Sequence, residues 1–266
     1  MRGFISLAVL LAVGCAEAPL LPWLAATPPD LPVVAGGDTK TIRGADLAAR
    51  AGVVLVVEPV AGSPTLLVGA PLTVARPEAT TPGSSTVLAC LDGYRATLRA
   101  DDLQGSTPWL AWAAWGSEVF AATDAQGKRI ALGPYYLVWD AADRGAERPW
   151  PFQVHRLEGL TAPAYGAITP AATAPPEVRA GFAVYEGHCA KCHALGGIGG
   201  DLGPELGCPA GVTTYWQRAA LARWIAEPAA LRRGARMPPS GLGAADIEAV
   251  IRYLEHMATA LDCGAR

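Results

Sequence analysis

The sequence predicts an α+β protein of two domains, in which a mostly-β N-terminal domain is followed by an all-α C-terminal domain. The chain has 266 residues, more than a single domain usually needs. Apolar residues make up 51% of the composition and charged residues 17%, which is enough apolar material for two packed cores. Short apolar runs between turn residues give way to helical periodicity after residue 176. We therefore expect one domain at 31–160 and another at 177–266.

The first fifteen residues are typical of an export signal. Arg2 precedes an apolar run too short to span a bilayer readily, and small residues end this run before Cys15. The end of the run resembles a bacterial lipobox, so we expect residues 1–14 to be a lipoprotein signal peptide and Cys15 to be lipidated. Ordinary signal-peptidase cleavage is the alternative. A retained membrane helix is disfavoured because the Pro-rich segment 19–32 follows at once.

The N-terminal domain is expected to be built from short strands. Its apolar runs lie between turn residues, as in sheet proteins. Short helical turns are expected at 46–50 and 101–103. Trp109, Trp112 and Trp115 recur every third residue, and we interpret them as core residues rather than an electron relay. The expected strands are Val53–Val57, Thr65–Val68, Thr86–Cys90 and Tyr135–Trp139.

The segment 161–176 is rich in Ala, Pro and Thr and has no periodic apolar face, so it is predicted to be a semi-stiff linker. Helical periodicity follows it. We expect helices at 177–185, 215–226 and 244–260, the last with Ile247, Val250, Ile251 and Leu254 on one face.

The run Cys189-Ala190-Lys191-Cys192-His193 has the spacing of a c-type haem attachment sequence. Two thiols three positions apart lie on one side of a helical turn, where each can add to a haem vinyl group. The adjacent imidazole can then bind the iron. A zinc half-site would need a second ligand pair, and a redox dithiol is typical of a βαβ context, so haem is favoured over both.

Residues 177–260 resemble the class I cytochrome c family. The resemblance rests on Gly181-Phe182 and Tyr253-Leu254, which match the crossing of the first and last helices, and on Gly203-Pro204 and Arg236-Met237-Pro238. It implies one haem c held by Cys189, Cys192 and His193. It also implies that the Pro204 carbonyl accepts a hydrogen bond from the imidazole, and that the loop containing Met237 supplies the sixth iron ligand.

Other side chains compete with Met237 for the sixth position. Met257 and His256 lie on the last predicted helix, which flanks the haem in the resembled family, and His188 precedes the attachment motif on the proximal side. Met237 is therefore preferred. A His/Met pair raises the reduction potential relative to two histidines, which predicts a mid-to-high-potential carrier.

Six cysteines fit an exported chain. Apart from Cys15 and the haem pair, three remain, and the natural disulfide within the C-terminal domain is Cys208–Cys263, provided that the two approach closely enough. Cys90 would stay single and is interpreted as a buried small apolar residue.

Residues 90–159 resemble the later part of the sulfite-oxidase molybdopterin-binding fold. The resemblance rests on Asp92-Gly93-Tyr94-Arg95, Trp109-Leu110-Ala111-Trp112 and Gly133-Pro134-Tyr135-Tyr136. Cys90 is the sole candidate metal ligand, but it stands immediately before the segment that lies downstream of the metal-binding cysteine in that family. We therefore expect a shortened relative at 31–160 without molybdopterin.

These observations predict a periplasmic monohaem cytochrome, lipid-anchored to a bacterial membrane, that passes single electrons between redox protein partners. The N-terminal domain would dock a partner or position the haem, and the chain would be a carrier rather than an enzyme. The alternatives are a haem-coupled molybdopterin oxidoreductase acting on a small substrate, and a haem sensor or peroxidase. The net charge is −3, so the chain lacks the excess of basic residues that a nucleic-acid-binding surface needs, and nucleic acid is not expected as a partner.

Overall fold

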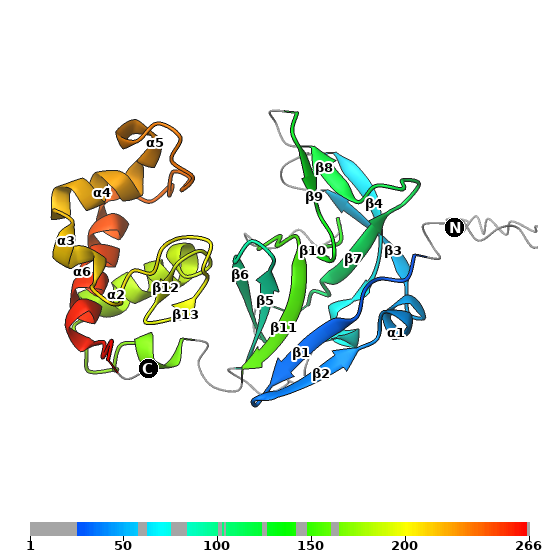
Figure 1. Ribbon diagram of the computed structural model, residues 1–266, viewed down its shortest axis with the longest axis horizontal. Coiled ribbons are helices and arrows are strands. Elements are labelled where there is room, and N and C mark those ends of the chain that lie inside the picture. Colours follow the sequence, from blue (N-terminus) through cyan, green and yellow to red (C-terminus); the bar gives the residue numbers. More distant parts are fainter. Residues whose placement is uncertain are drawn as a thin grey trace, which may run out of the picture.

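The computed structural model describes residues 26–57, 63–75, 84–100, 103, 105–123, 127–141, 148–160 and 165–264. They form an N-terminal β lobe and a C-terminal helical lobe (Figure 1). The expected signal peptide, Cys15 and most of the helical turn expected at 101–103 lie outside the described residues. No helix within the described ranges is long and apolar enough to cross a membrane.

The first sheet of the N-terminal domain has five strands in the order β2-β1-β11-β5-β6. β1 runs parallel to β11, while every other neighbouring pair in this sheet is antiparallel. The pairing of β1 with β11 brings the first and last strands of the domain side by side. The strands are β1 (Leu31–Ala35), β2 (Asp38–Ile42), β5 (Ser85–Cys90), β6 (Arg95–Arg99) and β11 (Val154–Leu160).

The second sheet has four antiparallel strands in the order β10-β7-β4-β3. Smaller elements accompany it: α1 (Gly44–Ala48), a 3-10 turn at Leu72–Val74, and a hairpin of β8 (Ala121–Thr123) and β9 (Arg129–Ala131). The four strands of the sheet are β3 (Gly52–Val57), β4 (Pro64–Pro71), β7 (Trp109–Ala114) and β10 (Tyr136–Val138).

The four strands that the sequence predicts are all present with slightly different bounds. Three of them are β3, β4 and β10 of this sheet, and the fourth is β5 of the first sheet.

The main core lies between the two sheets. Leu88, Leu98 and Leu157 from the first sheet join Leu110 and Leu137 from the second in one buried cluster. Because side chains alternate along a strand, the other face of the second sheet packs a separate cluster.

The tryptophans divide between these two clusters. Trp112 is buried in the main core and Trp109 packs on the second cluster, because positions three apart in a strand face opposite sides. Trp115, which follows the strand, is 37% exposed and does not fit the core interpretation.

The helical domain is organised by the crossing of its first and last long helices. At the crossing, a Cβ atom on Gly181 would lie 2.7 Å from the Cβ of Tyr253, so glycine permits the backbones to approach. The helices are α2 (Pro176–Val184), α3 (Val212–Tyr215), α4 (Arg218–Ala226), α5 (Pro228–Leu231) and α6 (Ala244–Ala260), with a short hairpin of β12 (Ala194–Leu195) and β13 (Ile198–Gly199).

Two expectations about this domain need correction. The helix expected at 215–226 is broken, because Trp216 is extended and its ring packs on Trp224 at 5.7 Å between centroids. The described part of the expected linker, from Tyr165 on, packs on the helical core. Tyr165 and Ile168 are buried, and the Tyr253 hydroxyl donates to the Ile168 carbonyl at 2.7 Å.

Candidate functional site

The attachment segment forms a closed turn at the end of α2. A wide π turn, Tyr185–Cys189, continues the helix, and the amides of Cys192 and His193 both donate to the Cys189 carbonyl, at 3.0 and 2.9 Å. Cys189 and Cys192 are both free thiols in partly exposed positions. The two sulfurs are thus available to one ligand, as addition to two vinyl groups requires.

The surroundings of the two thiols do not supply the further ligands of a zinc site. Burial raises the pKa of the Cys189 thiol to about 12 and also raises the pKa of the Cys192 thiol. Among the described residues, no group of three or more His, Cys, Asp or Glu side chains could hold a metal ion.

His193 is held by its ring and by its backbone. The Pro204 carbonyl accepts a hydrogen bond of 2.8 Å from Nδ1, which leaves the Nε2 lone pair for a metal. The Tyr185 hydroxyl donates to the His193 carbonyl at 2.8 Å. A Cβ atom on Gly203 would lie 2.6 Å from Nδ1, so the ring rests directly on the backbone of this loop. These residues fit a proximal haem ligand of fixed orientation.

Glu205 organises the loop that carries Pro204. Its carboxylate accepts hydrogen bonds from the amides of Gly196, Gly197, Gly207 and Cys208, at 2.7 to 3.2 Å. Burial alone would raise the pKa of this carboxyl, but the four N–H donors lower it by more, so the net shift is downward. Sequence analysis missed this residue. Its one local signal is an acidic side chain among surrounding glycines.

Cys208 and Cys263 form a disulfide, with 5.5 Å between their Cα atoms. Cys208 follows the Glu205 loop and Cys263 lies just beyond the end of α6. The bond therefore ties the loop on the proximal side of the site to the end of the chain.

The candidates for the sixth iron position are placed differently from one another. Met257 is 3% exposed and belongs to the helical core, so its thioether is already used in packing. His188 is exposed on the π turn, and His256 is partly buried on α6. Met237 lies partly exposed in the segment between α5 and α6 and is not part of that core. Its role as sixth ligand stays a prediction.

The comparison with known families covers this same region. Residues 176–254 match the family described as cytochrome c oxidase, cbb3-type, subunit III. This region is a c-type cytochrome domain. The match begins at the first residue of α2 and ends within α6, so it contains the helix crossing, the attachment turn and the loop with Met237. Such a domain binds haem c. No curated protein matches the chain.

The N-terminal domain lies outside the matched residues, and its resemblance to the sulfite-oxidase fold stays a prediction. Cys90 is buried in the main core on β5, where burial raises the pKa of its thiol to about 12. This placement agrees with the structural interpretation of Cys90.

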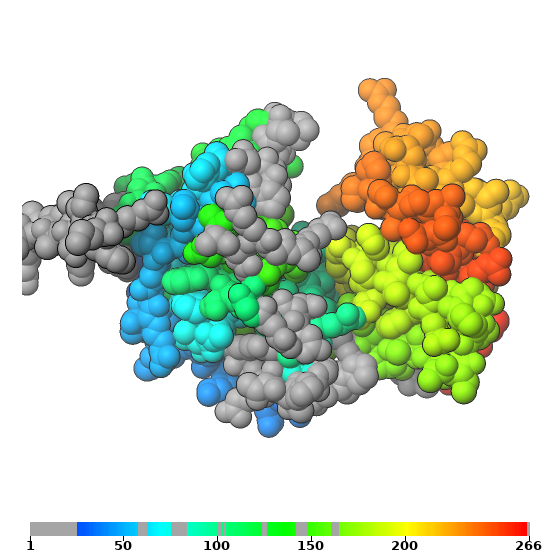
Figure 2. Space-filling view, turned by 180° about the vertical axis from the view of Figure 1, so that it is seen from behind, coloured from blue at the N-terminus to red at the C-terminus, as the bar shows by residue number. Residues whose placement is uncertain are grey.

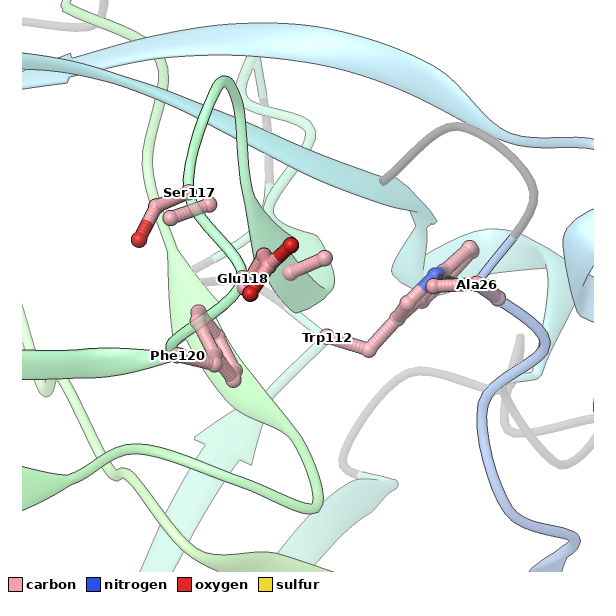
Figure 3. A pocket seen from close by; sticks show the side chains of 7 residues that line it. Ala26, Trp112, Ser117, Glu118 and Phe120 are labelled. Atoms are coloured by element: carbon pink, nitrogen blue, oxygen red, sulfur yellow. Dashed lines mark hydrogen bonds between the residues drawn. The ribbon is translucent and has the colours of Figure 1, made fainter. Parts of the chain in front are cut away.

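One cavity of about 290 Å³ lies in the N-terminal domain beside Trp112 (Figure 3). Its wall is mostly hydrocarbon, with Glu118 contributing a carboxylate and Phe120 an aromatic ring. Trp112 is held there by a hydrogen bond of 3.0 Å from its indole to the Ala26 carbonyl. Cys90 does not line this cavity, so the two features do not combine into one metal site.

Proposed function

We propose that the chain is a membrane-anchored periplasmic monohaem c-type cytochrome that passes single electrons between two redox proteins. One observation carries the proposal: Cys189 and Cys192 lie on one closed turn beside an imidazole whose Nδ1 is bound to the Pro204 carbonyl. This arrangement supplies two thioether positions and one oriented nitrogen ligand, which is what covalent haem attachment requires.

The cytochrome domain's own residues define what the site does. Haem c supplies the one-electron chemistry. Cys189 and Cys192 would hold the ring covalently, His193 would bind the iron through Nε2, and Met237 would take the opposite side. If His193 and Met237 both bound the iron, oxygen and peroxide would be excluded, and the domain would function as a carrier rather than as a peroxidase or ligand sensor.

The proposed location follows from the disulfide and the N-terminal sequence. A Cys208–Cys263 bond is stable in an oxidising compartment, which supports export. Lipidation of Cys15 would anchor the chain to a bacterial membrane and place the N-terminal domain between anchor and haem. Cys15→Ser should release the protein from the membrane fraction; a variant that stays bound would contradict the lipid anchor.

The experiment is a redox titration of the full chain, matured in a host that attaches haem c and followed by visible absorption. We expect one reversible one-electron transition per chain and an unchanged ferrous spectrum under carbon monoxide at neutral pH. Carbon monoxide binding would indicate an open sixth position and favour a sensor or peroxidase. Absence of a haem transition would contradict the proposed function itself.

A further inference from the structure

The N-terminal domain contacts the cytochrome domain at the haem-attachment turn. The Arg95 amide, at the start of β6, donates to the Lys191 carbonyl at 2.9 Å, and the Asp201 amide donates to the Gly93 carbonyl at 3.0 Å. Lys191 directly precedes Cys192, and Asp201 lies two residues before the glycine under the His193 ring. The β5–β6 turn, residues 91–94, and the first residue of β6 therefore bind both backbone segments that shape the proximal side of the site.

Side chains along β6 extend this contact. Ala96 and Leu98 point into the sheet core, so Arg95, Thr97 and Arg99 point outward. The Thr97 hydroxyl is 3.2 Å from the Tyr165 hydroxyl, and Arg99 forms an ion pair with Glu186 at the attachment turn. In Figure 2 the yellow-green residues of the cytochrome lobe meet the N-terminal lobe.

The tip of the turn carries a carboxylate next to its contacts with the cytochrome domain. The Asp92 carboxylate accepts a hydrogen bond of 3.0 Å from the Tyr94 amide, which fixes its position on the turn. Gly93, the next residue, accepts from the Asp201 amide, and the Arg95 amide donates to the carbonyl of Lys191, which directly precedes Cys192.

A charged side chain on this turn would stabilise the two redox states of the haem iron to different extents. Ferric haem carries one positive charge more than ferrous haem, so a nearby carboxylate stabilises the ferric form and lowers the midpoint potential. In the haem-loaded protein the Cys192 sulfur would be a thioether to the haem. Asp92 would then place a negative charge on the turn that contacts the attachment segment, and the positive charge of Lys191 would act in the opposite sense.

We propose that the β5–β6 turn of the N-terminal domain is one wall of the haem site and that the Asp92 carboxylate lowers the midpoint potential of the haem. This inference rests on the proposed function, because it requires haem on Cys192. It assigns the N-terminal domain a direct role in setting the driving force for electron transfer.

The first test compares Asp92→Asn with the parent, both full-length and haem-loaded. The Asn side-chain oxygen can still accept from the Tyr94 amide, so the turn is kept while the charge is lost. We expect a higher midpoint potential, with a difference that shrinks as salt is added because Asp92 is exposed. Glu118→Gln removes a carboxylate from the loop between β7 and β8 and should leave the potential unchanged. Equal potentials for parent and Asp92→Asn would overturn the proposal.

The second test separates the domains at the turn. Gly93 has φ +91°, and a Cβ atom there would lie 2.8 Å from the Leu202 amide nitrogen, so Gly93→Ala should push the turn away from the cytochrome domain. Gly37 also has φ +91° but has no heavy atom within 4 Å of its Cβ position. Gly37→Ala therefore carries the same backbone strain without the clash.

Hydrogen exchange at the Arg95 and Asp201 amides reports docking without reference to the haem. We expect both amides to be protected in the parent and in Gly37→Ala and to exchange faster in Gly93→Ala. In that undocked background, Asp92→Asn should shift the potential less than it does in the parent. A full shift despite exposed amides, or unprotected amides in the parent, would contradict the proposed wall.

Failure of this inference can be told apart from failure of the proposed function. A chain that takes up no haem refutes the function, while the two amides still report whether the turn docks. If Gly93→Ala does not fold, the comparison of Asp92→Asn with Glu118→Gln decides the inference alone.

Discussion

His193 is held on several sides by groups that leave one nitrogen for iron. Pro204 accepts from its Nδ1, Tyr185 donates to its carbonyl, and Gly203 lies against its ring. Each contact limits a different motion of the imidazole, so the ligand is oriented before the metal binds. Pre-orientation of this kind keeps structural change small between the two redox states.

Met237 is expected to complete the iron coordination. Met237→Ala should abolish the weak near-infrared sulfur-to-iron absorption of the ferric protein, because the thioether bond is lost. Met257→Ala is the control: it should keep that band while losing about 2–5 kcal/mol of stability, since Met257 is buried in the helical core. Loss of the band in the Met257 variant alone would contradict the ligand assignment.

Glu205 should make the cytochrome domain sensitive to acid. Its carboxyl pKa is lower in the folded protein than in the unfolded chain, so its stabilisation is present above the unfolded pKa and lost as pH falls through the folded value. Glu205→Gln should cost about 2 kcal/mol at pH 7 and flatten this part of the acid dependence. Denaturant unfolding at several pH values measures both effects. A variant with the parent's stability at pH 7 would show that the four amides do not need the carboxylate.

The α2–α6 crossing depends on the absence of a side chain at Gly181. Gly181→Ala should destabilise the domain by about 1–3 kcal/mol, because the new methyl group meets Tyr253 and the Ala249 backbone. Gly187→Ala, in the π turn of the same segment, has open space at its Cβ and should be near neutral. Similar denaturation midpoints for the two variants would mean that the helices can move apart at little cost.

Elements with strong local patterns could be predicted from sequence, and those that depend on distant partners could not. The helix α6 has the expected bounds, since its apolar face repeats over seventeen residues. The break at Trp216 and the burial of Tyr165 follow from packing against residues remote in sequence.

The same distinction applies to the site. The attachment turn is a local motif, and the Pro204 contact followed from the family resemblance. The four amides bound by Glu205 and the β5–β6 contact are set by tertiary structure. The parallel pairing of β1 with β11 likewise has no local signal.

At the scale of the whole molecule, the two domains share one polar contact surface around the haem-attachment turn. Figure 1 shows β5, β6 and β11 on the side of the N-terminal domain that faces β12 and β13. The N-terminal domain is thus placed where the proposed wall would affect the haem.

Cys90 is buried in the main core and does not line the cavity beside Trp112, so we expect the N-terminal domain to hold no molybdenum. Metal analysis of protein matured in a host with both haem-attachment and molybdopterin pathways should find one iron and no molybdenum per chain. Stoichiometric molybdenum would make the chain a haem-coupled oxidoreductase. In that case Cys90→Ser should remove the molybdenum and leave the iron content unchanged.

One haem bound covalently through Cys189 and Cys192 is tested most directly by mass spectrometry of the denatured protein. We expect a mass increase of one haem, located on the proteolytic peptide that contains both cysteines and His193. A chain that retains two free thiols at these positions after maturation, or that releases its haem on denaturation, would contradict it.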